Sequence, residues 1–327
     1  MTTGASEPAD SAALGRGRSS QTPAAIPASG WRDILARTFR AISKDYVSLV
    51  AAGMAFYTML AIFPGLTALA SLYGIFADPA DMQAHLQTMA GVMPAGAMSI
   101  IDGLMDRLAQ EERQSLGLSA LFSLALAIWG STKGVKAFIA AMNIAYEEEE
   151  KRGFLALNLT ALALTGFLVV LALLSLLTVL VVPAALELLP VPARTDELMT
   201  ILRWPAIALI FMFMLAVLYR YTPSRSDAKW AWVSTGSIVA VVLWLVASMA
   251  FSIYVRNFAN YDESYGSVGA VVALLMWLWL SAYVMVMGAE LNAEAERQTR
   301  RDTTVNPERP MGERGAHAAD TLGKSRN

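Results

Sequence analysis

The stretch Tyr265–Asn292, YGSVGAVVALLMWLWLSAYVMVMGAELN, decides the fold class of this chain. From Val268 to Ala289 it carries no charged residue, and Ser281 and Tyr283 are its main polar interruptions. At the rise of an α-helix this run is roughly 33 Å long, which is enough to cross the hydrocarbon core of a bilayer. The stretch therefore predicts a transmembrane helix.

The composition of the whole chain supports a membrane protein. Of its 327 residues, 56% are hydrophobic and only 16% are charged, whereas soluble domains carry about 25% charged residues. The formal net charge of −2 predicts no attraction to nucleic acids. The chain has no cysteine and two histidines, so no thiol chemistry, metal site, cofactor or catalytic residue is predicted.

Charge-free apolar runs recur along the chain and predict an all-α, polytopic membrane protein with six transmembrane helices in residues 31–297. Pro64 lies in the first run and predicts a kink there, since proline removes one helical hydrogen bond. A basic amphipathic helix over residues 31–44 is predicted to lie at the membrane surface before the first span. The six spans are predicted at about residues 46–77, 115–140, 154–183, 203–220, 230–255 and 267–291.

The distribution of positive charge predicts the orientation of these helices. With the N-terminus in the cytoplasm, 20 of the 25 lysines and arginines fall on the cytoplasmic side, in agreement with the positive-inside rule. Both termini are therefore predicted to be cytoplasmic. The long outer loop, residues 78–114, has amphipathic helical spacing and is predicted to pack on the bundle or to act as a mobile lid.

The two ends of the chain are predicted to be disordered cytoplasmic tails. Residues 1–30 are rich in Ala, Ser, Pro and Gly without an apolar segment, and residues 298–327 combine Pro, Gly and scattered charge, a composition that is typical of disorder. Near the start of the second tail, Glu296 and Arg300 have the i, i+4 spacing of a helical ion pair.

Four charged residues lie near the predicted cytoplasmic ends of the second, fourth and sixth spans. A carboxylate at a helix C-terminus opposes the helix dipole, so Glu290 is predicted to need a basic partner. The alternative is that all four side chains extend to the membrane surface independently. The predicted intramembrane polar cluster consists of Lys133, Lys136, Arg220 and Glu290.

Four stretches together resemble the YihY/BrkB family of six-helix bacterial inner-membrane proteins. They are AAGMAFYTMLAIFPGL (51–66), LAIWGSTKGVKAFIAAMNIAY (126–146), LYRYTP (218–223) and the opening stretch. The resemblance covers about residues 31–297 and implies a multi-pass location in the inner (plasma) membrane. It also implies an envelope role, which has been suggested to include movement of lipids or other solutes. The family once carried the label ribonuclease BN.

The residues themselves argue against a ribonuclease and against any enzyme. The four adjacent carboxylates Glu147–Glu150 point in different directions on a helix and cannot converge on one metal ion. We expect a transporter or flippase-like protein for an amphiphilic or lipid-derived substrate, with membrane lipids as partners and no nucleic acid. A non-transporting envelope scaffold is the alternative, and a homo-oligomer stays open.

Overall fold

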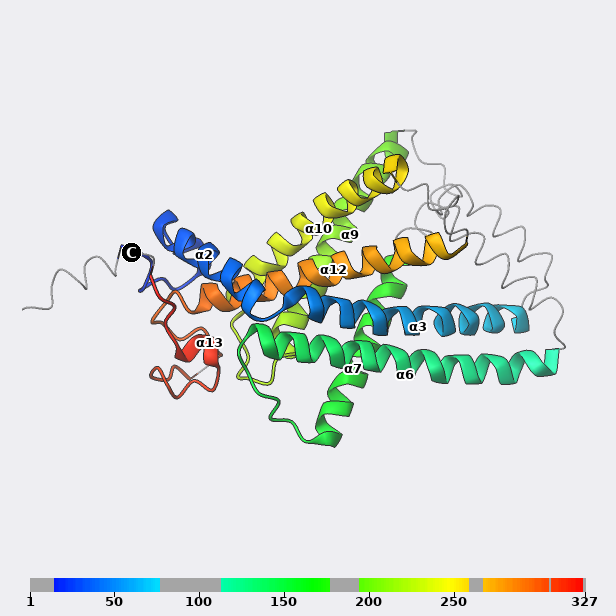
Figure 1. Cartoon of the computed structure of the whole chain (residues 1–327), viewed down its shortest axis with the longest axis horizontal. Helices are drawn as coiled ribbons and strands as arrows, with labels where there is room; N and C mark the ends of the chain where they lie inside the picture. The colour runs from blue at the N-terminus through cyan, green and yellow to red at the C-terminus, as the bar shows by residue number, and fades with distance from the viewer. Residues whose placement is uncertain (1–14, 77–112, 177–193, 259–266, 306, 326–327) are drawn as a thin grey trace, which may run out of the picture. The chain divides into compact units, whose positions relative to one another are not determined.

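The computed structural model describes residues 15–76, 113–176, 194–258, 267–305 and 307–325, and these residues are helical apart from turns, loops and one isolated β-bridge. The prediction of an all-α membrane protein is confirmed (Figure 1). A short 3-10 helix, η1, comes first. The helices in chain order are η1 (Pro23–Ala25), α2 (Ala28–Lys44), α3 (Val47–Phe76), α6 (Arg113–Ala145), α7 (Phe154–Leu176), α9 (Arg194–Tyr221), α10 (Trp230–Phe258), α12 (Ser267–Glu296) and α13 (His317–Asp320).

Each of the six predicted spans falls on one long helix, α3, α6, α7, α9, α10 or α12. Within the described residues, four segments are long and apolar enough to cross a membrane: Leu121–Ala145, Phe154–Leu171, Trp230–Val255 and Val271–Glu296. The bent pair formed by α2 and the start of α3 gives a fifth if it counts as one span, and Pro205–Tyr221 is shorter. The count of six and the cytoplasmic termini therefore stay predictions, and the loop 78–114 lies almost wholly outside the described residues.

The exposed surface of these helices is apolar, as a lipid-facing surface requires. In an apolar 18-residue stretch of the Trp230–Val255 segment only 11% of the residues are buried. Large side chains such as Phe154, Leu155 and Leu118 are mostly exposed. Water would penalise such a surface by about 25 cal/mol for each Å² of apolar area, whereas lipid does not.

The helix α2 confirms the predicted amphipathic helix, but its buried face is not purely apolar. Ile34 and Thr38 are buried on that face together with the charged Asp33 and Arg37. The helix ends beside Tyr46, whose φ of 49° is a left-handed conformation that α-helices do not continue through.

The chain divides into two compact units, one formed by residues 1–51, 138–246 and 281–327 and the other by residues 52–137 and 247–280. In the second unit, α3 and α6 approach closely where a Cβ on Gly130 would lie 3.1 Å from the Cα of Ala61. In the same unit, the Trp277 indole donates to the Ser248 hydroxyl at 3.3 Å. Pro64 lies inside α3, which continues to Phe76, so the proline does not end the helix and the kink stays a prediction.

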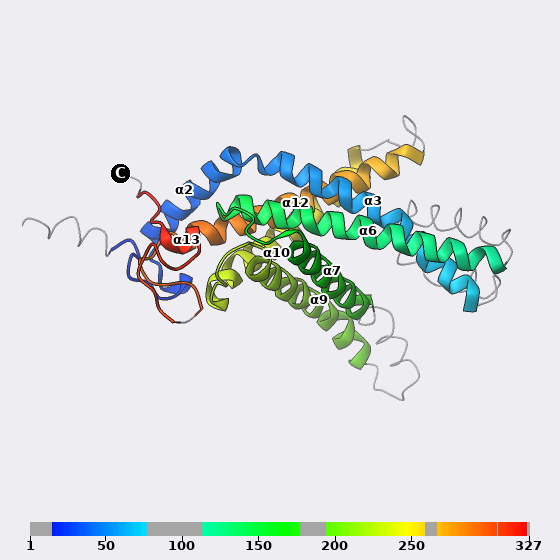
Figure 2. The same cartoon turned by 90° about the horizontal axis from the view of Figure 1, so that it is seen from below.

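In the first unit, aromatic rings join α7, α9 and the start of α10. Figure 2 shows α7 and α9 side by side, and Phe167 of α7 meets Phe213 of α9 edge to face. Phe213 also stacks on Trp230, the first residue of α10. Offset and edge-to-face arrangements of this kind add to the free energy of apolar burial.

The helices α10 and α12 pack backbone against backbone in the first unit. A Cβ on Gly236 would lie 2.2 Å from the Gly288 carbonyl oxygen, so no larger residue fits there. Asn292 fixes the same contact, because its Oδ1 accepts from the Gly236 N–H at 2.7 Å and its Nδ2 donates to the Val233 carbonyl at 3.1 Å. In the segment Gly288–Asn292 near the end of α12, the first and last residues thus serve helix packing.

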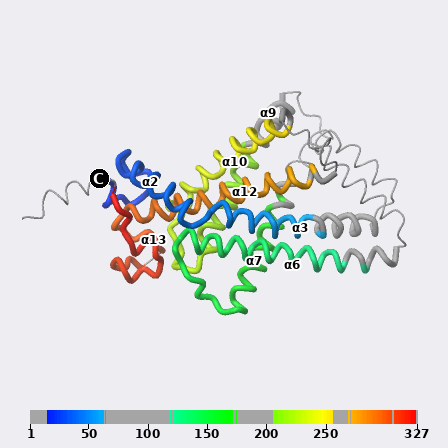
Figure 3. The backbone as a smooth tube through the Cα atoms, viewed as in Figure 1, coloured from blue at the N-terminus to red at the C-terminus, as the bar shows by residue number. Residues whose placement is uncertain are grey.

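The two ends of the chain fold together in the first unit, so the prediction of disordered tails is wrong for residues 15–30, 298–305 and 307–325. Figure 3 shows the segment from residue 15 beside the C-terminal segment. The Arg18 side chain donates to the Gly323 carbonyl at 2.6 Å, and the Gly323 N–H donates to the Arg297 carbonyl at 2.9 Å. Composition alone predicted disorder because it contains no information about hydrogen bonds between distant segments.

Replacing Gly288 with alanine is expected to destabilise the protein by about 1–3 kcal/mol, because overpacking forces the backbones apart. The added Cβ would lie 2.5 Å from the Tyr219 hydroxyl and 2.9 Å from the Ala240 Cβ. Thermal unfolding in detergent measures the effect. Gly166→Ala is the matched control, since no atom lies within 4 Å of its Cβ position, and equal melting temperatures for the two variants would contradict the close packing.

Candidate functional site

The C-terminal end of α12 carries three buried carboxylates in the first unit. Glu290 is 1% exposed, Glu294 is 5% exposed and Glu296 is 0% exposed. Burial of a charge costs several kcal/mol unless a partner compensates it. Two of the three side chains have such partners and the third does not, and this difference defines the candidate site.

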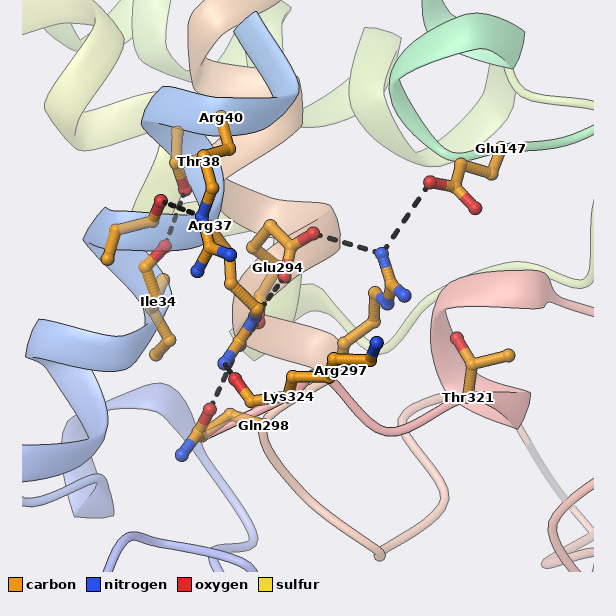
Figure 4. Close-up of polar contacts among 12 residues, drawn as sticks. Ile34, Arg37, Thr38, Arg40, Glu147, Glu294, Arg297, Gln298, Thr321 and Lys324 are labelled. Atoms are coloured by element: carbon orange, nitrogen blue, oxygen red, sulfur yellow. Dashed lines mark hydrogen bonds and ion pairs between the residues drawn. The ribbon is translucent and has the colours of Figure 1, made fainter. Parts of the chain in front are cut away.

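Glu294 is paired with Arg37 of α2. The Arg37 Nε donates to the Glu294 carboxylate, and its Nη2 donates to the Glu294 carbonyl and to Gln298 Oε1, both at 2.9 Å (Figure 4). The remaining Arg37 nitrogen donates to the Lys324 carbonyl at 3.1 Å. One guanidinium therefore joins α2, α12 and the C-terminal segment.

Glu296 is paired with Arg225, which lies in the loop between α9 and α10. Both side chains are fully buried, and the two nitrogen–oxygen contacts measure 2.7 and 3.2 Å. Thr303 donates a third hydrogen bond to Glu296 at 2.7 Å. The Arg225 guanidinium also lies over the Tyr146 ring at 4.2 Å, and burial raises the pKa of this tyrosine, which stays a neutral phenol.

Glu147, in the turn after α6, is approached by three basic side chains from different segments. Lys44 approaches its carboxylate at 2.7 Å, His317 at 3.0 Å and Arg297 at 3.7 Å. Its φ of 52° places it in the left-handed region, a strained conformation for a residue that is not glycine. The hydrogen bond from Lys44 lowers the pKa of Glu147, against the raising effect of burial.

Glu290 is the exception among the three, because its Oε1 is buried with no hydrogen-bond partner among the described residues. A buried acceptor left unsatisfied costs about 1–3 kcal/mol. The burial of Glu290 therefore carries a free-energy cost, whereas the neighbouring Glu294 and Glu296 are compensated by ion pairs with arginines.

The predicted cluster of Lys133, Lys136, Arg220 and Glu290 stays a prediction. Within the described residues no ion pair joins Glu290 to Arg220, whose guanidinium lies over the Trp230 ring at 4.6 Å instead. Lys133 lies 5.7 Å from the Trp129 ring centroid. Both lysines belong to the second unit, so their pairing with Glu290 stays a prediction.

Sequence reasoning missed the arginine partners of the buried acids. Glu296 was expected to pair with Arg300 along the helix, but it pairs with Arg225, 71 residues away. The sequence feature that could have indicated such partners is the group of three acids, Glu290, Glu294 and Glu296, at the end of an apolar helix. Arg297 is a neighbour of Glu294 at i, i+3, but Arg37 and Arg225 lie 257 and 71 residues from Glu294 and Glu296, and helical spacing finds only neighbours.

Among the described residues, no group of three or more His, Cys, Asp or Glu side chains is arranged to hold a metal ion. The run Glu147–Glu150 forms bonds of other kinds. Glu148 pairs with Lys151 at 2.9 Å and accepts from the His317 N–H at 2.6 Å. Glu150 accepts from Arg152 at 2.7 Å and from Asn143 at 3.0 Å.

The long apolar helices with exposed apolar side chains define an integral membrane protein. The family described as Virulence factor BrkB matches residues 38–312, and the chain belongs to this family. The resemblance to YihY/BrkB proteins that the four sequence stretches indicate is thus confirmed.

Two relatives are similar over most of their length. A protein of Bacillus subtilis (strain 168), named putative ribonuclease-like protein YfkH, is 27% identical over 247 residues, which cover 74% of this chain and 88% of the relative. A UPF0761 membrane protein of Vibrio atlanticus (strain LGP32) is 25% identical over 262 residues, 79% of this chain and 80% of the relative. No solved structure matches.

Replacing Arg225 with glutamine is expected to destabilise the protein by about 3–5 kcal/mol, because it leaves the Glu296 charge buried without its partner. The double variant Arg225→Met/Glu296→Leu should recover most of this loss, since an apolar pair of similar volume needs no compensation. Thermal unfolding in detergent compares the variants. Lys151→Gln is the control from a pair whose lysine is 60% exposed, and it is expected to cost less than about 1 kcal/mol.

The stability that Glu150 contributes is expected to disappear at acidic pH. Hydrogen bonds from Arg152 lower the pKa of Glu150 from 4.5 to about 2. Because the folded pKa is depressed, this contribution is present above pH 4.5 and is lost as the pH falls toward 2. Glu150→Gln should therefore lower the melting temperature at pH 7 and have a smaller effect at pH 3. An equal effect at both pH values would contradict the assignment.

Proposed function

We propose that this protein moves an amphiphilic or lipid-derived substrate across the bacterial inner membrane, as a transporter or flippase-like protein. The observation that supports the proposal most is the buried Glu290 on an apolar helix, with one oxygen unpartnered among the described residues. Ionisable groups within membrane-spanning segments are costly and mark substrate, ion or proton pathways more often than structural positions.

The contrast with the neighbouring acids strengthens this argument. Glu294 and Glu296 are satisfied by arginines, which is how a carboxylate with a purely structural role is held. A carboxylate with an unoccupied oxygen can bind and release a proton or a cationic group without first breaking an ion pair at that oxygen. Glu290 is therefore the residue to which we assign coupling between binding and movement.

A non-transporting envelope scaffold is the second candidate. The interlocked chain ends favour it, since Arg18 and Arg37 tie the N-terminal segment to the C-terminal segment through buried hydrogen bonds. A rigid, closed end of this kind suits a protein that holds an assembly together. In this case Glu290 would contribute no activity.

We also propose that the protein is not an enzyme, although its Bacillus subtilis relative is named ribonuclease-like. The support comes from Glu147, Glu148 and Glu150, which are held by Lys44, Lys151 and Arg152 respectively. A metal-dependent nuclease needs carboxylates that converge on an ion. These three are instead directed to separate cations.

A reconstitution experiment tests the proposal. Full-length protein in liposomes is mixed with fluorescent lipids, and their movement between leaflets is followed by chemical quenching of the outer leaflet. Wild-type protein should accelerate this movement, and Glu290→Gln should reduce the rate about tenfold or more, because an amide cannot exchange a proton or bind a cation as a carboxylate does. The matched control is Glu149→Gln, since Glu149 is exposed.

Two outcomes would contradict the proposal. The first is wild-type protein that moves no lipid and no organic anion in a tested panel, which would favour the scaffold. The second is a Glu290→Gln protein that keeps the wild-type rate, which would remove the role of the buried carboxylate. A melting temperature for each variant shows that the protein is folded.

A further inference from the structure

The C-terminal segment that follows α12 lines an open, solvent-facing cavity of about 310 Å³. This segment contains α13 and belongs to the first unit (Figures 1 and 3). Arginines predominate in its lining. The residues that line the cavity and enter the argument are Arg300, Arg301, Asp302, Glu308, Arg309 and Arg314.

The wall of the cavity is held rigid by Arg314, which is 5% exposed. Its guanidinium donates to the carbonyls of Arg300 and Ala319 at 2.7 Å, and to those of Arg301 and Arg309 at 3.1 Å. Four backbone carbonyls are therefore held by one side chain. Arg314 supplies the structure of the site, and its nitrogens are not available to a ligand.

Asp302 fixes the opposite part of the same loop. Its Oδ1 accepts from the Thr304 N–H at 2.8 Å, and its Oδ2 accepts from the Arg309 N–H at 2.9 Å. The same carboxylate lies 4.0 Å from Arg314, so these two opposite charges compensate each other. A cavity framed in this way is formed before any ligand arrives, which reduces the entropic cost of binding.

The remaining charges around the cavity are unbalanced. Arg301 and Arg309 face the single carboxylate of Glu308. Arg301 and Arg309 are exposed, and within the described part of the chain neither side chain is held in an ion pair. The cavity therefore has a surplus of positive charge with guanidinium groups accessible from solvent.

We propose that this cavity binds a phosphate-bearing anion. Guanidinium groups match phosphate oxygens through paired N–H donors, and several of them around one concave site suit the double charge of a phosphate better than a single carboxylate. The volume is at the lower end of small-ligand pockets, about 300–1,000 Å³. The site contains neither Glu290 nor any other residue of the proposed pathway, so it stands independently of the transport proposal.

Two sources supply this chemistry, a free phosphate in the cytoplasm and the headgroup of a phospholipid. Full-length protein in a phosphate-free buffer with non-ionic detergent is titrated separately with inorganic phosphate and with short-chain phosphatidic acid at constant ionic strength. The heat of binding is measured by titration calorimetry. Saturable binding of phosphate alone or of both ligands supports a site for free phosphate groups. Saturable binding of phosphatidic acid alone supports a headgroup site.

The double variant Arg301→Gln/Arg309→Gln should weaken the observed binding about tenfold or more, since each charged hydrogen bond lost is worth a large part of that factor. The control is Arg32→Gln/Lys324→Gln, which removes two positive charges at exposed positions outside the cavity. Unchanged melting temperatures without ligand show that both variants fold. Absence of saturable binding in the wild type, or an equal loss in the control, would overturn the proposal.

Discussion

The first unit depends on one constraint, the pairing of buried acids at the end of α12 with arginines from distant segments. Glu294 needs Arg37 of α2, and Glu296 needs Arg225 of the loop before α10. Because an uncompensated buried charge is so costly, each pair fixes the position of the segment that supplies the arginine. The end of α12 is therefore the point at which the N-terminal helix, this loop and the C-terminal segment meet.

Helix packing supplies the second requirement for this arrangement. Without a side chain on Gly236 and Gly288, α10 and α12 come close enough for Asn292 to bond the α10 backbone. In a membrane, where apolar side chains gain little by leaving lipid, close backbone contact and interhelical hydrogen bonds are what hold helices together. Gly236, Gly288 and Asn292 are thus explained by helix packing, whereas Glu290 makes no contact that explains its burial in the described residues.

The sequence predicted the helical elements well and the ends of the chain poorly. Hydropathy located six long helices because lipid demands long uninterrupted apolar runs. The tails looked disordered because their content of Pro, Gly and charge is high, yet Arg18 and Arg314 order them by donating to backbone carbonyls. The proposed cluster around Glu290 combined helix ends by topology alone, and topology does not specify which cation lies nearest. In the structure the Arg220 guanidinium lies over the Trp230 ring, and no ion pair with Glu290 is found among the described residues.

The sequence by itself determined that this is a helical membrane protein of the BrkB family, since length, apolar composition and four local motifs are properties of consecutive residues. Only the tertiary structure decided what the charged residues near the helix ends do. Arg37 and Arg225 became the partners of buried acids, Glu147 became the meeting point of Lys44, Arg297 and His317, and one oxygen of Glu290 was left without a bond in the described chain. The physical reason is that these contacts join residues tens to hundreds of positions apart, and their energies depend on burial, which sequence spacing does not reveal.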